Sequence, residues 1–495
     1  MEERLNFRIL GIIAFILGVI HNILFFDHGL GINVPIFVLV AIAGGILLTL
    51  RFNTLIRKEH IAIFLIPAFV FSTMVFVRAS ELLTFFNLVA VVFLLSIFAA
   101  SFLQKNIRLY LPMDYVRIAL LPLHFIKSFF GTISKMLNFS KISRENPITI
   151  EVIRGSIIAV IAISLFSLLF ASADDVFRKL FLDLRFIELD SEPFIRLILI
   201  VIVSSVFISA FGYMFSKGMQ KEETRVSSKR TLGKIETMII LGGINLLFLL
   251  FIILQFAYLY GGEIRVTELG LTYAEYARKG FFELIIVAVL SFIIIFEAER
   301  RIIQSNNSHS LLFKTLSIFL IVEVLLILIS AFARLTLYED AYGFTDIRFY
   351  SHALMIWMGA ILLFLALHIL FNQKRETFIF RVLVLSILFL FGINILNPEA
   401  FISRSNIRRY EKTGKLDTMY LARLSDDALP ETIGLLDEPN EEIRNAFAKE
   451  LYLVISRGNS DKKDWSSTSL PKMRAQELVA SRRAQLEQNK DILVP

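Results

Sequence analysis

Hydrophobic residues occur along the 495-residue chain in long blocks that are separated by short polar segments. The blocks are roughly 17–25 residues long, the length of α-helix that crosses a hydrocarbon core of about 30 Å. The pattern therefore predicts an all-α fold, a polytopic transmembrane helix bundle with eleven spans. These spans lie at residues 9–26, 33–50, 60–77, 82–103, 152–173, 194–215, 236–260, 281–298, 311–333, 350–371 and 379–396.

Lys and Arg residues in the loops predict the orientation of the bundle. With the N-terminus inside, the inner segments hold roughly twice as many Lys and Arg residues as the outer segments, in line with the positive-inside rule. We therefore expect a multi-pass protein of the cell membrane with a cytoplasmic N-terminus. Because the number of predicted spans is odd, the C-terminus is expected on the extracytoplasmic side.

The predicted spans fall into two groups, four within residues 1–103 and seven within residues 150–396. Residues 104–149 lie between them, and no apolar run there is long enough to cross a membrane. Their Lys residues stand beside Phe and Met residues, which favours a basic amphipathic segment on the anionic lipids of the inner leaflet. An ordinary solvated connector helix fits the same pattern. The bilayer itself is the one partner that the whole chain implies.

After Asn397-Pro398 the composition becomes that of a soluble domain, which occupies residues 397–495. Helical periodicity appears at residues 416–424 and 441–456. The face expected to be buried in the second of these helices carries Ile443, Phe447, Leu451 and Val454. We expect a small α-helical domain that leans on the outer face of the bundle.

Composition and motifs exclude several classes of chemistry. The chain has no cysteine, which rules out disulfides, thiolate metal sites and cysteine nucleophiles. The net charge is +7, but the Lys and Arg residues are concentrated in the loops on the predicted inner side of the membrane. The charge therefore does not indicate a nucleic-acid partner. The seven histidines lack metal-ligand spacing, and no nucleotide, zinc-protease or serine-hydrolase motif is present. The sequence therefore predicts neither a metal nor a cofactor.

Three predicted outer segments are rich in charged and aromatic residues, at 172–192, 263–280 and 334–352. The topology places them on one side of the membrane, where they would form a charged vestibule that binds a small polar or ionic ligand. The candidate residues in these segments are Asp174, Asp175, Glu275, Arg278, Arg334, Tyr338, Asp346 and Arg348. An interfacial belt also contains charged and aromatic residues, so a purely structural role is the alternative.

Glu323 lies about half-way along the span at 311–333. A carboxylate at mid-membrane has to be protonated, paired or hydrated, because its bare charge is poorly solvated there. Glu323 is therefore the candidate residue for coupling to protons or cations. A neutral Glu that bonds to a neighbouring helix is the alternative interpretation.

A second carboxylate enters the membrane at the span that covers residues 281–298. Thr272 and Glu275 have the spacing of a capping box, which predicts a helix that begins at Thr272 and continues into this span. Glu283 lies one turn inside the span, where an unpaired charge costs on the order of 2–3 kcal/mol. We therefore expect Glu283 to be partnered within the protein, by Lys279 or by an arginine of another outer segment.

The first outer loop, residues 25–35, carries Asp27 next to His28. Polytopic glycosyltransferases that use lipid-phosphate donors place an acidic base in this loop, so Asp27 is a candidate catalytic base. A simple turn explains Gly29 and Gly31 equally well.

Several segments resemble the signature of a family of bacterial multi-pass membrane proteins that is catalogued only as a domain of unknown function. They are LFASADDVF (169–177), YAEYARKGFFEL (273–284), RLTLYEDAYGFTDIRFY (334–350), NPEAFISRSNIRRY (397–410) and LDTMYLARLSDDALP (416–430). The resemblance covers roughly residues 150–440 and departs near Ser466 and Ser467, where an arginine is expected. It implies a bacterial cytoplasmic membrane and supplies no catalytic residue.

Three functional hypotheses follow from these observations. The first is binding or proton-coupled transport of a small polar or ionic ligand at the outer vestibule. The second is an extracytoplasmic transferase that uses a lipid-linked donor, with Asp27 as its base. The third is a membrane scaffold that recruits envelope partners through the tail.

Overall fold

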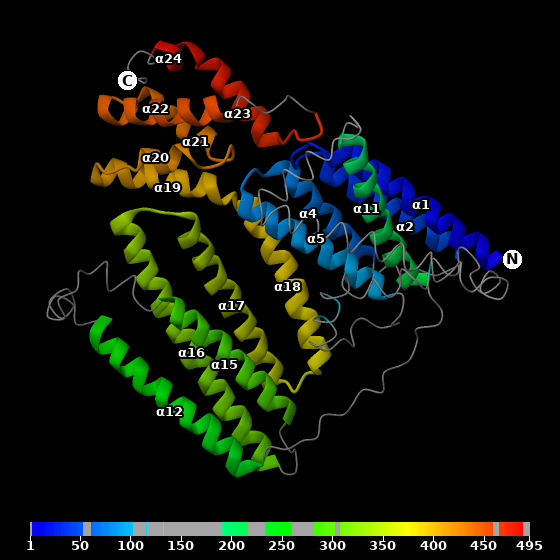
Figure 1. Cartoon of the computed structure of the whole chain (residues 1–495). Coiled ribbons are helices and arrows are strands. Elements are labelled where there is room, and N and C mark those ends of the chain that lie inside the picture. Colours follow the sequence, from blue (N-terminus) through cyan, green and yellow to red (C-terminus); the bar gives the residue numbers. More distant parts are fainter. Residues whose placement is uncertain are drawn as a thin grey trace, which may run out of the picture.

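The computed structural model describes residues 2–52, 61–101, 191–215, 233–259, 281–301, 307–458 and 465–488, together with Tyr115, Ile118 and Thr132 (Figure 1). Within these residues every regular element is a helix, and eight helices are long and apolar enough to cross a membrane. They are α1 (Glu2–Phe25), α2 (Asn33–Arg51), α5 (Glu81–Ser101), α11 (Ser191–Phe215), α12 (Lys234–Leu259), α16 (Asn307–Tyr342), α17 (Asp346–Leu370) and α18 (Arg375–Leu396).

The predicted count of eleven spans is not confirmed. Residues 60–77 are covered by η1 (Ile61–Leu65), a π-helical segment, and by α4 (Ile66–Val77), which are apolar but shorter. The span predicted at 281–298 lies in α15 (Phe281–Arg301), which carries charged residues at both ends. The span predicted at 152–173 and the basic segment at 104–149 lie, apart from three single positions, outside the described residues.

The helices form two groups that meet at α18 (Figure 1). Helices α1, α2, α4, α5 and α11 enclose one apolar core, which includes Phe7 and Phe71. Helices α12, α15, α16 and α17 enclose a second core, which includes Leu320 and Leu362. Side chains of α18 pack against both cores, so this helix is the seam between the two groups.

A buried amide pair fixes this seam. Asn87 of α5 and Asn394 of α18 are both fully buried, and each side chain donates to the other at 2.8 Å. Such reciprocal hydrogen bonds hold helices together where hydrophobic attraction between them is weak, as it is in a lipid environment.

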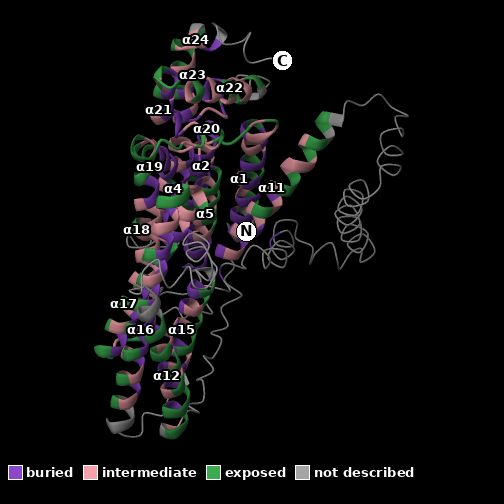
Figure 2. Ribbon diagram, turned by 90° about the vertical axis from the view of Figure 1, so that its left-hand side faces the viewer, coloured by how far each residue is buried: buried purple, intermediate pink, exposed green. Residues whose placement is uncertain are grey.

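The outward faces of the bundle are apolar. On α12 the residues Leu246 and Leu247 are 70% and 62% exposed, and much of the α12 ribbon has the green of exposed residues in Figure 2. Exposed apolar faces of this extent are characteristic of surfaces that contact lipid or another protein. Together with the length of the helices, they define an integral membrane protein.

The tail forms a compact helical cap at one end of the bundle (Figure 1). Its elements are α19 (Pro398–Thr413), α20 (Thr418–Ala422), α21 (Leu429–Thr432), η3 (Ile433–Asp437), α22 (Glu441–Gly458), α23 (Leu470–Ser481) and α24 (Arg483–Gln488). Phe447 and Leu451 lie in the core of this cap, as the periodicity predicts, whereas Val454 is 39% exposed. The face of α22 that is buried therefore covers fewer turns than predicted.

Helix α16 continues nine residues beyond the predicted span, to Tyr342. No helix-breaking residue occurs before Gly343, which has a φ of 86°. Thr345 then stands at the N-cap of α17, which begins four residues before the span predicted at 350–371. As a result Glu339 lies in helix α16 and not in a loop.

Candidate functional site

The loop between α1 and α2 makes the first contact with the tail. The N–H groups of Ile32 and Asn33 donate to the carbonyl oxygens of Thr468 and Ser466, at 3.0 and 3.1 Å. The fully buried Asn33 side chain fixes the loop, because its Oδ1 accepts from the N–H of Gly31 at 2.8 Å. The loop and the tail therefore contact each other directly through their backbones.

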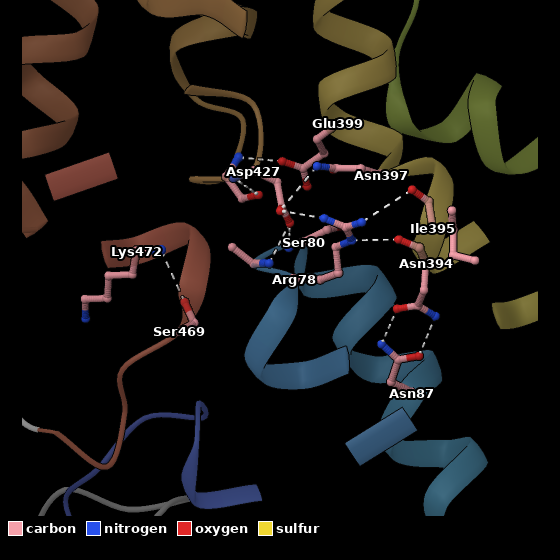
Figure 3. Close-up of polar contacts among 12 residues, drawn as sticks. Arg78, Ser80, Asn87, Asn394, Ile395, Asn397, Glu399, Asp427, Ser469 and Lys472 are labelled. Atoms are coloured by element: carbon pink, nitrogen blue, oxygen red, sulfur yellow. Dashed lines mark hydrogen bonds and ion pairs between the residues drawn. The ribbon is translucent and has the colours of Figure 1, made fainter. Parts of the chain in front are cut away.

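The turn between α4 and α5 makes the second contact, which Figure 3 shows. Asp427 of the tail is 5% exposed, and its Oδ2 accepts from the N–H groups of Ala79 at 2.6 Å and Ser80 at 3.2 Å. The Nη1 atom of Arg78 lies 3.6 Å from Oδ1 of Asp427, and Arg78 Nε also donates to the carbonyl of Asn394 at 2.7 Å. The tail carboxylate thus caps the start of α5 and pairs with a cation, both of which are stabilising.

Glu399 lies beside this contact, in the first turn of α19 (Figure 3). It is 6% exposed, and its Oε2 accepts from the N–H of Ser425 at 2.6 Å. Burial raises the pKa of Glu399 above its usual value, against the opposing effect of the hydrogen bonds from Ser425. Burial likewise raises the pKa of Asp427, where the N–H of Ala79 and the charge of Arg78 oppose the shift.

The raised pKa of Glu399 predicts that this residue stabilises the docked tail most in mild acid. A carboxyl whose pKa is higher in the folded state binds its proton more tightly there, so its contribution is present below the unfolded pKa and is lost as pH rises through the folded pKa. We expect the free energy of unfolding to fall between pH 4 and neutral pH more steeply in the wild type than in Glu399→Gln. Parallel pH profiles of melting temperature for the two proteins would exclude a titrating Glu399.

The turn between α16 and α17 makes the third contact. The side-chain amide of Asn406 in α19 pairs with the backbone of Phe344 in both directions, at 2.8 Å each. Arg409, one turn further along α19, donates to the last carbonyls of α16, those of Asp340 at 2.8 Å and Ala341 at 2.5 Å. A cation at a helix C-terminus compensates the partial negative charge of the unpaired carbonyls. The tail therefore caps α16 as well as α5.

A polar cleft of about 460 Å³ lies at this third contact. We call it the junction cleft; its walls are Ala341, Tyr342, Phe344, Thr345, Arg348, Asn406, Arg409, Lys415, Leu416, Asp417 and Tyr420. Three of these side chains are cationic, and Asp417 is the single carboxylate among them. The Asp417 carboxylate already accepts from the N–H of Tyr420 at 2.9 Å, at the start of α20. The cleft is therefore electropositive.

An apolar cavity of about 490 Å³ lies next to the junction cleft, between α16, α17, α18 and α19. Its walls are Phe332, Glu339, Phe344, Phe349, His352, Ala353, Ile356, Leu388, Phe389, Gly392, Ile393, Leu396 and Phe401. Glu339 and His352 are the only ionisable residues among them, and Glu339 Oε2 lies 3.5 Å from His352 Nε2. Phe344 belongs to the walls of both spaces.

The structure brings three of the predicted site residues together at the turn between α16 and α17. The guanidinium of Arg348 lies 4.2 Å above the ring of Tyr338 and also donates to the carbonyl of Gly343. Asp346 interacts with the tail, because its Oδ2 accepts from the hydroxyl of Tyr420 at 3.2 Å. This part of the predicted vestibule therefore faces the tail.

The other predicted residues are dispersed. Asp174, Asp175, Glu275 and Arg278 lie outside the described residues, as does Thr272 of the predicted capping box. Glu323 and Arg334 are buried within α16, at 2% and 7% exposure. The side chain of Glu283 is exposed in the first turn of α15. Asp27 is exposed at the end of α1 and lines neither the junction cleft nor the apolar cavity.

Sequence reasoning missed the residues that the tail contributes. Arg409 and Lys415 supply two of the three cations of the junction cleft, and Asp427 supplies the carboxylate that caps α5. Arg409 and Asp427 lie within the tail segments that carry the family resemblance, which was the available signal. Their partners are separated from them by dozens to hundreds of residues, so no local pattern indicates the contacts.

These features define a class of protein, a multi-pass integral membrane protein with a helical cap that docks on one end of its bundle. The chain belongs to the family described as Domain of unknown function (DUF4153), whose model matches residues 65–435. The match covers the second contact, the turn between α16 and α17, and every wall residue of the junction cleft. No curated protein and no solved structure matches the chain.

Proposed function

We propose that this membrane protein binds a small anionic ligand in the junction cleft. The observation that supports the proposal is the excess of cations there, with Arg348, Arg409 and Lys415 facing a cleft of about 460 Å³ that has one carboxylate. That volume falls within the range of roughly 300–1,000 Å³ found for ligand pockets. The predicted topology puts the cleft on the extracytoplasmic side.

The chemistry of the cleft favours an oxyanion such as phosphate. Guanidinium groups bind carboxylates and phosphates through pairs of parallel hydrogen bonds, and an ammonium group adds a mobile point charge. Arg348 and Arg409 are held in place by their bonds to backbone carbonyls, so little conformational entropy is lost when they bind a ligand. All three guanidinium nitrogens of Arg409 already donate to carbonyls, so Arg409 offers its charge and its second Nη hydrogens. Asn406 and Tyr420 supply neutral hydrogen-bonding groups in the same walls.

We expect Lys415→Gln to weaken the binding of inorganic phosphate about tenfold, which corresponds to a loss of about 1.4 kcal/mol. Lys415 is exposed, so its replacement removes a cation without disturbing the packing of the tail. Isothermal titration of phosphate into the full-length protein in a nonionic detergent measures the change. The affinity is also expected to fall as ionic strength rises, because the attraction is screened.

Lys412→Gln is the matched control, since Lys412 is exposed on α19 and does not line the cleft. It lowers the net charge by the same amount and is expected to leave the affinity unchanged. Equal losses in the two variants would mean that phosphate responds to overall charge and not to the cleft. The absence of phosphate binding to the wild type would overturn the proposed function.

Coupling of ligand passage to protons is the second candidate function. Glu323 is the residue that would bind and release the proton. Both oxygens of its carboxyl group are buried without a hydrogen-bond partner among the described residues. A carboxyl group in that position holds its proton, because its bare charge is poorly solvated there. Entry of water or of a cation beside Glu323 would release the proton, and this would couple ligand passage to protons.

We expect Glu323→Gln to abolish the proton-dependent part of ligand flux in proteoliposomes and to leave phosphate binding unchanged, since Gln keeps the shape of the side chain but cannot titrate. Glu283→Gln, at the exposed end of α15, is the control and should leave flux unchanged. Undiminished proton-dependent flux in Glu323→Gln would remove Glu323 from the mechanism.

A further inference from the structure

We propose that the ligand of this protein is an anionic lipid, whose phosphate head lies in the junction cleft and whose chain enters the apolar cavity. The inference rests on the proposed function, which it extends from an anion to an amphiphile. The supporting observation is that the junction cleft and the apolar cavity are neighbours, with Phe344 in the walls of both.

The apolar cavity has the chemistry of a chain-binding site. Phe332, Ile356 and Leu388 line its part furthest along the membrane helices from the tail, and Phe401 of α19 lies at the end next to the tail. The cavity lies between helices whose outward faces are themselves apolar and exposed. A hydrocarbon chain can leave the surrounding lipid for such a space at little cost, because the walls are as apolar as lipid tails and give it close packing contacts.

The Glu339–His352 pair gives the cavity one polar position. Glu339 is 3% exposed, and the His352 ring packs edge-on against Phe332 at 4.1 Å between ring centroids. Glu339 lies in the last full turn of α16, close to where the junction cleft begins at Ala341. The pair therefore stands at the depth where a lipid carries the polar linkage between its phosphate and its chain, and it offers hydrogen-bonding groups to that linkage.

Charge complementarity selects a lipid with an anionic head. A zwitterionic head adds a cation that has to approach Arg348, Arg409 and Lys415, whereas a phosphate monoester presents negative charge alone. A free phosphate satisfies the cleft but leaves the apolar cavity without an occupant. Phosphatidic acid combines both requirements and is the probe that fits the two spaces together.

Gly392 offers a way to close the cavity without disturbing the fold. It lines the cavity on α18, and a Cβ atom added at this residue meets no heavy atom within 4 Å. Gly392→Leu therefore places a side chain in open space within the cavity. Gly243 on α12 has equally open surroundings and does not line the cavity, so Gly243→Leu is the matched control.

The test is a titration of the full-length protein in a nonionic detergent, followed by native mass spectrometry for lipids and by calorimetry for phosphate. The probes are dioleoyl phosphatidic acid, dioleoyl phosphatidylcholine and inorganic phosphate. We expect phosphatidic acid to bind more tightly than inorganic phosphate, because its chain packs in the apolar cavity while its phosphate head occupies the cleft. Gly392→Leu should weaken phosphatidic acid binding at least about tenfold and leave phosphate binding as in the wild type. Gly243→Leu should change neither.

The outcomes separate this inference from the proposed function. If Gly392→Leu binds phosphatidic acid as tightly as Gly243→Leu does, the chain lies elsewhere and the inference is overturned, while phosphate binding in the cleft stands. Equal binding of phosphatidylcholine and phosphatidic acid overturns the role of the cationic cleft in selecting the lipid. If neither phosphate nor phosphatidic acid responds to Lys415→Gln, the proposed function fails as well.

Discussion

Replacement of Asp427 by Ala is expected to lower the free energy of unfolding by about 3–5 kcal/mol, the cost of breaking a buried ion pair from one side. The change leaves Arg78 without its carboxylate, although Arg78 keeps its bond to the carbonyl of Asn394. It also removes the acceptor of the N–H groups of half-buried Ala79 and of buried Ser80. Chemical denaturation of the full-length protein in detergent measures the loss.

A second ion pair of the tail provides the control. Asp437 pairs with Arg482 at 2.7 Å, but their side chains are 51% and 39% exposed. Exposed pairs contribute about 0–1 kcal/mol, so Asp437→Ala is expected to have a much smaller effect than Asp427→Ala. We also expect proteases to cut the tail of Asp427→Ala faster, because the contact that is lost joins the tail to the bundle. Similar losses in both variants would show that Asp427 does not hold the tail in place.

Gly31→Ala is expected to destabilise the docked tail by about 1–3 kcal/mol, the usual cost of overpacking. A Cβ atom at this position lies 2.5 Å from the carbonyl oxygen of Thr468 and 2.6 Å from the carbonyl carbon of Ser467. Both are backbone atoms, so no side chain can rotate away to make room. The loop cannot retreat either, because the buried Asn33 amide holds it.

Gly29→Ala tests this interpretation in the same loop. There the nearest atom to an added Cβ is the Cβ of Ser467 at 3.5 Å, which is ordinary van der Waals contact. We expect Gly29→Ala to melt within a degree or two of the wild type and Gly31→Ala to melt several degrees lower. If the two variants melt alike, the loop between α1 and α2 does not lie against the tail.

The sequence allowed the membrane helices to be predicted because each is specified locally, by a block of apolar residues and a turn signal. The burial of Phe447 and Leu451 follows from periodicity. The prediction that Val454 is buried was wrong. Periodicity shows which residues share a face of a helix, but not how far along the helix the neighbouring elements cover that face.

Only the part of the candidate site that comes from residues 334–352 could be predicted from the sequence. Arg348, Tyr338 and Asp346 come from a single stretch that is visibly rich in charge and aromatics, and they do lie together. Arg409 and Lys415 come from the tail, and their position depends on how the tail docks. That docking rests on pairs such as Arg78 and Asp427, which are far apart in sequence and carry no local signal.

An experimental density map of the full-length protein with phosphate, at a resolution that shows side chains, would reveal directly whether the junction cleft binds an anion. We expect density for a tetrahedral anion in the junction cleft, within hydrogen-bond reach of Arg348, Arg409 and Lys415. A cleft that holds only water in that map, with Lys415 paired to Asp417 across it, would show that the cleft is not an anion site.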